Sequence, residues 1–123
     1  MSINEYLDIF EKKAFAHLAT LMPDGSPQVT PVWVSHQDGF ILINSAEGRQ
    51  KDLNMERDPR VAVSIQDPDD PYRYLQIRGE VVEITRNGAD EHIDQLAKHY
   101  LDLDSYPSRV ENEVRKIYKI KPY

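Results

Sequence analysis

Two turn sequences divide the first part of the chain into short β segments. Residues 23–26 read Pro-Asp-Gly-Ser and residues 37–39 read Gln-Asp-Gly, and both place glycine beside residues that favour a tight turn. The intervening segments alternate or are densely apolar, as β-strands are, and they cover residues 14–21, 28–35 and 40–44. Because parallel strands need long crossover connections, turns this short predict an antiparallel meander.

The rest of the chain supplies the remaining elements of a small barrel. Helices are expected over residues 2–12, over residues 49–57 with Leu53 and Met55 turned inward, and from residue 87 onward. Further strands are expected over residues 60–66, 72–85 and 114–120. Six antiparallel strands with helices predict a mainly β fold, because closing the sheet into a barrel removes exposed strand edges.

Length and composition exclude several classes of protein. A chain of 123 residues is long enough for one domain, assigned to residues 1–123, and its net charge of −6 argues against nucleic acid or an anionic membrane as a partner. The sequence has no cysteine and no apolar run of about 20 residues that could cross a bilayer. The beginning has no basic region before an apolar one, which predicts a cytoplasmic protein without a signal peptide.

The sequence lacks the motifs of common catalytic machinery. Its five glycines lie far apart, so neither a dinucleotide fingerprint nor a phosphate loop is present, and there is no G-x-S-x-G turn. His92 and His99 are interpreted as exposed helix residues, His17 as half-buried and His36 as a strand-end residue facing water. The acidic run at residues 67–70 is interpreted as a solvated loop. No metal site and no catalytic residue are predicted.

One basic turn stands out against the acidic background. Arg49 and Lys51 lie where the chain enters the expected helix 49–57, and free backbone N–H groups at such a point favour an anion. Residues 48–60 hold four bases against three acids, whereas residues 66–113 hold five bases against twelve acids. The turn therefore suits a phosphate group. The alternative is a solvated turn whose cations pair with the neighbouring acids Asp52, Glu56 and Asp58.

Pro31 interrupts the strand expected over residues 28–35. Proline donates no ladder hydrogen bond, so this strand should have an open side. Its backbone could lie against a flat heterocycle and contact the edge of the ring. The alternative is an ordinary edge-strand proline that deters aggregation.

At these residues the chain resembles a known superfamily. The resemblance rests on four segments in order: AFAHLATL at residues 14–21, PDGSPQVTPVW at residues 23–33, GRQKDLN at residues 48–54 and DPRVAV at residues 58–63. It is similar to the pyridoxamine 5′-phosphate oxidase-like split-barrel superfamily, and most like its deazaflavin-dependent (coenzyme F420) oxidoreductase branch. The resemblance implies a six-stranded antiparallel split β-barrel of the FMN-binding kind and a homodimer with the cofactor at the subunit interface.

The resemblance also implies which residues form the cofactor site. The backbone of Gln28, Val29, Thr30, Pro31, Val32 and Trp33 would line the ring, Ser45 would border the site, and Arg49, Gln50, Lys51 and Asn54 would lie at the phosphate-bearing tail. The R-x-K spacing of Arg49 and Lys51 resembles the deazaflavin branch, whereas FMN oxidases more often show adjacent Arg and Lys. The expected cofactor is therefore coenzyme F420, with FMN as the alternative.

The implied activity is hydride transfer between the bound deazaflavin and a small, hydrophobic, conjugated substrate. The cofactor supplies the redox chemistry, which agrees with the missing acid-base machinery. Trp33, Tyr72 or Tyr74 would form walls of the pocket, and solvent could supply the proton. The alternatives are an FMN-dependent oxidoreductase on the same fold and a non-catalytic flavin- or haem-binding protein.

Overall fold

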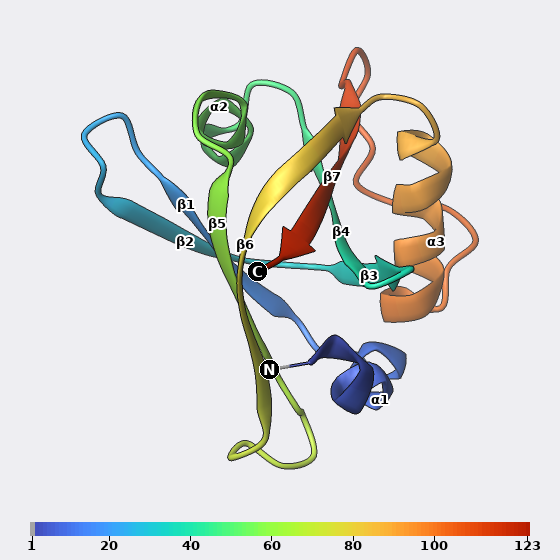
Figure 1. Ribbon diagram of the computed structural model, residues 1–123. Coiled ribbons are helices and arrows are strands. Elements are labelled where there is room, and N and C mark those ends of the chain that lie inside the picture. Colours follow the sequence, from blue (N-terminus) through green and yellow to red (C-terminus); the bar gives the residue numbers. More distant parts are fainter. Residues whose placement is uncertain (1) are drawn as a thin grey trace.

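A computed structural model describes residues 2–123 as one curled antiparallel sheet with three α-helices (Figure 1). The strands are β1 (Ala16–Leu21), β2 (Pro27–Val32), β3 (Val34–Gln37), β4 (Phe40–Ala46), β5 (Arg60–Gln66), β6 (Tyr74–Thr85) and β7 (Arg115–Pro122). The helices are α1 (Leu7–Glu11), which follows a 3-10 turn at Ile3–Tyr6, α2 (Gln50–Arg57) and α3 (Ala89–Leu101). The expected mainly β fold with helices is confirmed.

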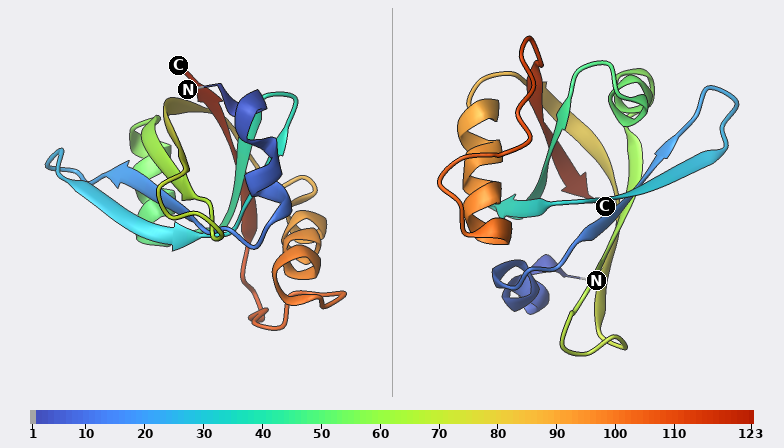
Figure 2. Two further views of the ribbon diagram at one scale, coloured as in Figure 1. Left: turned by 90° about the horizontal axis from the view of Figure 1, so that it is seen from below. Right: turned by 180° about the vertical axis from the view of Figure 1, so that it is seen from behind.

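The sheet returns on itself because its two edge strands are consecutive in the chain. The strand order is β2-β1-β5-β6-β7-β4-β3, with every neighbouring pair antiparallel. Only Trp33 separates β2 at one edge from β3 at the other. The sheet therefore curls into the expected split barrel, whose open shape is visible from below and from behind (Figure 2).

The strand expected over residues 28–35 is two strands, so the residues described contain seven strands and not six. β2 pairs with β1, in a register that includes His17 opposite Pro31, whereas β3 pairs with β4 at the far edge. A segment that serves two partners at opposite edges must bend between them. The bend falls at Trp33, which turns this side chain out of the regular ladder.

Alternating residues fill the interior of the curled sheet. Val61, Val63 and Ile65 of β5 are buried, while the residues between them are partly exposed. The α1 residues Ile9 and Phe10 pack into the same core, and α1 and α2 lie at opposite ends of the sheet (Figure 1). From α2 the core receives Met55, as expected, but Leu53 is exposed; Asp52 and Asn54 face inward in its place.

Helix α3 packs outside the barrel against β4 and β7. Its buried face carries Ile93, Leu96, Ala97 and Tyr100, which recur at helical spacing. The Tyr100 hydroxyl donates to the carbonyl oxygen of Ala14 at 2.6 Å and accepts from the Val34 N–H at 3.2 Å. Burial raises the pKa of this phenol. Tyr100 therefore fixes α3 to the segments that begin β1 and β3.

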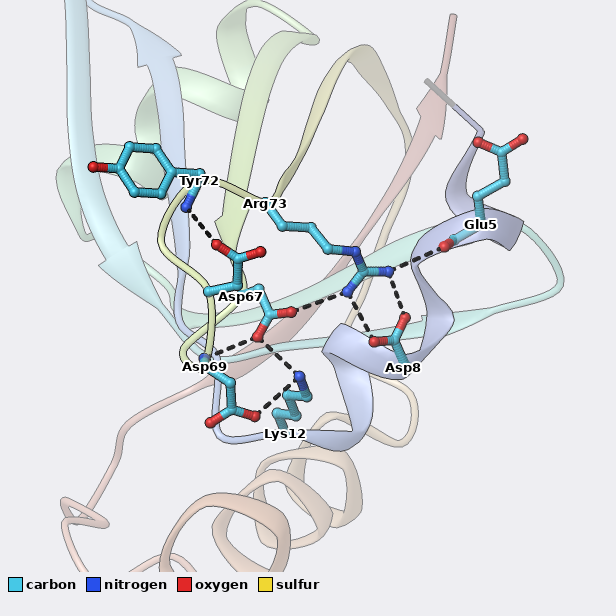
Figure 3. Close-up of polar contacts among 8 residues, drawn as sticks. Glu5, Asp8, Lys12, Asp67, Asp69, Tyr72 and Arg73 are labelled. Atoms are coloured by element: carbon cyan, nitrogen blue, oxygen red, sulfur yellow. Dashed lines mark hydrogen bonds and ion pairs between the residues drawn. The ribbon is translucent and has the colours of Figure 1, made fainter.

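An ion-pair cluster attaches the N-terminal segment to the loop between β5 and β6 (Figure 3). Asp67 accepts from Lys12 at 2.9 Å and from Arg73 at 3.0 Å, and Arg73 also binds Asp8 at 2.8 Å. Only 5% of the Asp67 side chain is exposed. The interpretation of residues 67–70 as a solvated run is wrong for Asp67, because Lys12 from the N-terminal segment and Arg73 from the same loop cover it.

Two residues show how closely the strands of the sheet pack and where β4 ends. A side chain at Gly79 would collide with the backbone carbonyl of Lys121, so the backbones of β6 and β7 approach closely there. Ser45, one residue beyond the strand expected over residues 40–44, lies inside β4 opposite Lys116 of β7. Among residues 2–123, no helix has both the length and the apolar character needed to span a bilayer.

Candidate functional site

A cavity of about 210 Å³ opens where β2, the turn into α2, α3 and the beginning of β7 meet. Its apolar lining comprises Phe15, Pro31, Val32, Trp33, Ile93 and Tyr106. Its polar lining comprises Asn44, Arg49, Lys51 and Arg115. The structure therefore brings the two unusual sequence features, the proline-bearing strand and the basic turn, to one cavity.

The turn between β4 and α2 presents its cations through a left-handed glycine. Gly48 has a φ of 92°, a value that side-chain-bearing residues rarely adopt, and its N–H donates to Asp52 Oδ2 at 2.9 Å. Arg49 follows in an extended conformation as the N-cap of α2, without a side-chain cap. Lys51 lies in the first turn of that helix.

The side chains of Arg49 and Lys51 make no hydrogen bond or ion pair with any residue from 2 to 123, whereas the neighbouring acids are already engaged. Asp52 pairs with Lys116 at 3.0 Å and Glu56 with the same ammonium at 3.1 Å, while Asp58 pairs with Arg60 at 2.8 Å. The alternative in which these acids neutralise the basic turn is therefore wrong.

The surroundings of the basic turn disfavour the positive charge of the Lys51 ammonium. Burial lowers the pKa of Lys51, and the charges of Arg49 and Arg115 lower it further. A half-buried ammonium beside two cations and without an acidic partner is stabilised by a bound anion.

Arg115 belongs to this site although nothing in the sequence indicated it. It is the first residue of β7, 64 residues beyond Lys51, and is 5% exposed. Its position follows from the register of β4 with β7, which sets Ala46 opposite Arg115 and so brings it beside the turn after β4. Such a pairing could not be read from one sequence, because the long-range strand order decides it.

An aromatic stack forms the apolar wall of the cavity. Trp33 lies parallel to Tyr100 at 5.2 Å between ring centroids, and Tyr106 meets Trp33 edge-on at 5.9 Å. The prediction of Trp33 as a wall agrees with this placement. Tyr72 and Tyr74, named with it, are exposed and are not among the residues that line this cavity.

Three other predicted residues gather in a polar cluster beside the cavity. Asn54 is fully buried and donates to Thr20 Oγ1 at 3.0 Å; Thr20 in turn donates to Gln28 Oε1 at 3.2 Å. Gln50 Nε2 donates to Asn54 Oδ1 at 2.9 Å. These contacts join α2 to β1 and β2, and none of the three residues lines the cavity.

Three further residues predicted for the site, Val29, Thr30 and Ser45, do not line the cavity. Val29 is 62% exposed and Thr30 is half-buried on β2. The outer edge of β2 pairs with no other strand of residues 2–123. Ser45 is buried, its Oγ lacks a hydrogen-bond partner among the residues described, and it does not line the cavity.

The interpretation of the α3 histidines as exposed is wrong. His92 lies four residues before Leu96 and eight before Tyr100, so it shares their buried face. Burial lowers its pKa to about 4, helped by the nearby charge of Arg115. His99 is half-buried and binds the Lys12 carbonyl at 2.7 Å.

The prediction is wrong for one of the two strand histidines and confirmed for the other. His17, expected to be half-buried, is exposed, and His36 is exposed as expected. Within residues 2–123, no group of histidines and acids is arranged to hold a metal ion.

Comparison with known proteins extends these observations. The family model for pyridoxamine 5′-phosphate oxidase matches residues 3–122. A solved structure described as an F420 reductase is 33% identical, with a TM-score of 0.83, and the match covers 94% of this chain and 91% of that one. A conserved hypothetical protein from Mycobacterium tuberculosis is 27% identical, with a TM-score of 0.73, covering 99% of this chain and 81% of that one.

A more distant structural match extends the likeness of fold alone. HupZ from Group A Streptococcus is 19% identical, with a TM-score of 0.68, covering 98% of this chain and 90% of that one. No curated protein matches the chain.

Proposed function

Because the chain belongs to the pyridoxamine 5′-phosphate oxidase family, we propose that it is an oxidoreductase with a phosphorylated flavin-type cofactor. The preferred cofactor is the deazaflavin coenzyme F420, with FMN as the alternative on the same fold. The similarity to a structure described as an F420 reductase supports the deazaflavin. The substrate class is a small, hydrophobic, conjugated molecule. Residues 1–123 would act as one cofactor-binding domain.

The observation that carries the proposal is the pair of unpartnered cations on the cavity wall. Arg49 and Lys51 both line the cavity and have no protein partner among residues 2–123, although acids lie close by. A phosphate group would neutralise them through charge-assisted hydrogen bonds, each worth about 1.5–3 kcal/mol. The residues present therefore fit the phosphate-bearing part of such a cofactor.

The chain's own residues would bind and orient the cofactor. Pro31 and Val32 of the edge strand β2 line the cavity, where a flat ring could lie against the backbone. Trp33, held by its stack on Tyr100, limits how far the ring can shift. The cofactor supplies hydride chemistry when it is bound. The protein's contribution is placement and exclusion of water.

A second copy of the chain would complete the site. Pockets that bury a ligand of this size usually measure about 300–1,000 Å³, whereas this cavity measures about 210 Å³. Exposed apolar residues close to the cavity, Phe15 at 50% and Val29 at 62%, could be covered by a partner. We therefore include a homodimer in the proposal, with the cofactor between the subunits.

Titration with both cofactors tests this function. Purified protein is titrated with coenzyme F420 and with FMN, and binding is followed through cofactor fluorescence. Lys51→Ala and Arg49→Ala should each weaken binding of the preferred cofactor about tenfold or more. Lys13→Ala removes an exposed lysine that does not line the cavity and should leave affinity unchanged.

Each outcome separates the alternatives. Tighter binding of F420 supports the deazaflavin, and tighter binding of FMN selects the flavin. Binding of neither cofactor would refute the function. Equal affinity in all variants would show that the basic turn does not hold the phosphate.

A further inference from the structure

We propose that Arg115 is a third anion-binding residue of this cavity and that His92 positions it through Asn44. The inference rests on the proposed function, because it assigns two further roles at the same site. Asn44, His92 and Arg115 come from β4, α3 and β7, which no sequence motif connects. The ligand group it concerns is the phosphate of the cofactor.

Three contacts hold the Arg115 guanidinium at the cavity wall. Its Nε donates to Asn44 Oδ1 at 2.8 Å and its Nη1 donates to Glu113 Oε1 at 2.6 Å. The guanidinium carbon lies 5.3 Å from the centre of the Tyr106 ring. Among residues 2–123, Nη2 has no hydrogen-bond partner, which leaves it for a ligand in the cavity that Arg115 lines.

The orientation of the Asn44 amide is fixed from the side opposite Arg115. Its Nδ2 donates both to the Ala89 carbonyl at 2.9 Å and to His92 Nδ1 at 3.1 Å. Because both hydrogens of the amide are used there, Oδ1 is the atom left to face Arg115. A flipped amide would place its NH2 group against the guanidinium, which also only donates.

His92 can support this orientation only as a neutral ring that accepts at Nδ1. The proton then lies on Nε2, which donates to Ser35 Oγ at 2.9 Å. Burial keeps the ring neutral, as does the positive charge of Arg115. The hydrogen bonds therefore run without interruption from Ser35 through His92 and Asn44 to Arg115.

The charge balance leaves a net attraction for an anion. Arg115 shares its charge with Glu113, whereas Arg49 and Lys51 have no acidic partner among the residues described. Together the three cations and one carboxylate leave two positive charges toward the cavity. A phosphate ester carries one to two negative charges near neutral pH and matches this surplus.

The first experiment compares phosphorylated and phosphate-free ligands. Affinities for FMN and riboflavin, and for F420 and its phosphate-free deazaflavin, are measured with Arg115→Gln and Arg109→Gln. Arg109 matches Arg115 in charge, pairs with Asp90 and Asp94, and is not among the residues that line the cavity. Arg115→Gln should lose about tenfold or more for the phosphorylated ligand and retain its affinity for the phosphate-free one. Arg109→Gln should change neither.

The second experiment separates positioning by His92 from a merely structural role. His92→Leu removes the acceptor for Asn44 and should lower the ratio of phosphorylated to phosphate-free affinity severalfold. His92→Asn offers a neutral acceptor at the place of Nδ1 and should restore that ratio. If His92→Leu does not fold, ¹⁵N spectra of the wild-type ring decide, with an unprotonated Nδ1 expected and a protonated Nδ1 contradicting the proposal.

The results distinguish failure of the roles assigned to Arg115 and His92 from failure of the proposed function. If wild-type protein binds neither cofactor, both are wrong. If binding depends on Arg49 and Lys51 but the affinity ratio is the same in Arg115→Gln and Arg109→Gln, only the inference about Arg115 is wrong. An unchanged ratio in His92→Leu overturns the role of His92 alone.

Discussion

At the scale of residues, the cavity combines charges that the folded chain does not neutralise. Lys51 lines it with a pKa lowered by burial and by two arginines, while Asp52, one position later, is committed to Lys116 and Tyr118. These two adjacent residues of α2 therefore have different roles. Asp52 holds α2 to β7, and Lys51 remains available to a ligand.

Lys51 should contribute little to the stability of the ligand-free protein. Lys51→Met removes a half-buried charge that has no acidic partner among residues 2–123, so the free energy of unfolding should stay the same or rise by up to about 1 kcal/mol. Urea unfolding measures this change, with Lys13→Met as control. A loss of more than about 1 kcal/mol would mean that Lys51 stabilises the fold itself.

The buried ring of His92 should make stability depend on pH. Its pKa is about 4 in the fold against an ordinary value of 6.5, so between these values the unfolded chain binds the proton more readily. The free energy of unfolding should therefore be highest above pH 6.5 and fall toward pH 4, by at most about 1.4 kcal/mol per pH unit.

Comparison with a non-titrating variant isolates this effect. His92→Asn should remove the contribution of the ring and flatten the curve between pH 6.5 and 4. The depressed pKa values of Asp58 and Asp67, about 2 in each case, act at lower pH and should remain in both proteins. Parallel curves for the two proteins across pH 4–6.5 would show that His92 does not titrate as described.

At the scale of elements, ion pairs between distant segments hold α1 to the loop that follows β5. Asp67 joins Lys12 and Arg73, and the neighbouring Asp69 joins Lys12 with 75% of its side chain exposed. The two aspartates therefore offer a matched comparison. They share one loop and one cation but differ in exposure.

Replacing Asp67 should destabilise the protein more than replacing Asp69. Asp67→Asn removes the shared acceptor of two cations, whereas Asp69→Asn removes one exposed pair. The thermal midpoint of Asp67→Asn should fall clearly at pH 7, and that of Asp69→Asn should change little. Equal shifts in the two variants would contradict the assigned role of the Asp67 cluster.

Local patterns in the sequence predicted most elements but not their long-range partners. The turns at residues 23–26 and 37–39, the β5 strand and the apolar face of α3 all follow from neighbouring residues, and the structure confirms them. The break at Trp33 does not, because it depends on β2 and β3 lying at opposite edges of the sheet.

In the candidate site, too, local sequence patterns predicted some residues, whereas long-range strand pairing determines others. Arg49, Lys51 and Pro31 stood out because each departs from its local context, and all three line one cavity. Arg115 and Asn44 carry no local signal, since only the register of β4 with β7 and the packing of α3 bring them there. Leu53 was wrongly placed inward because tertiary packing selected Asp52, Asn54 and Met55 for burial instead.

At the scale of the whole molecule, the curled sheet forms a split barrel whose interior is filled by side chains. Buried Ile, Leu, Val and Tyr residues form this core, so the proposed cofactor ring is assigned to a place outside it. The cavity beside β2 is the place where the basic turn and the aromatic stack meet. Because this cavity is small, we propose that a second copy of the chain buries part of the cofactor.

The proposed homodimer should be measurable in solution. Sedimentation velocity should give about twice the 14.3 kDa mass of the chain, and cofactor affinity should fall on dilution below the dimer dissociation constant. Val29→Asp, which places a charge on the exposed edge strand β2, should weaken association; Val82→Asp, at an exposed position on β6, serves as control. A monomer that binds cofactor with full affinity would contradict the shared site.

A crystal structure of the protein with its preferred cofactor tests the central claim most directly. The account predicts the phosphate within hydrogen-bonding distance of Arg49 and Lys51, and the ring beside Pro31, Val32 and Trp33. A phosphate bound elsewhere, with both cations still facing solvent, would contradict it.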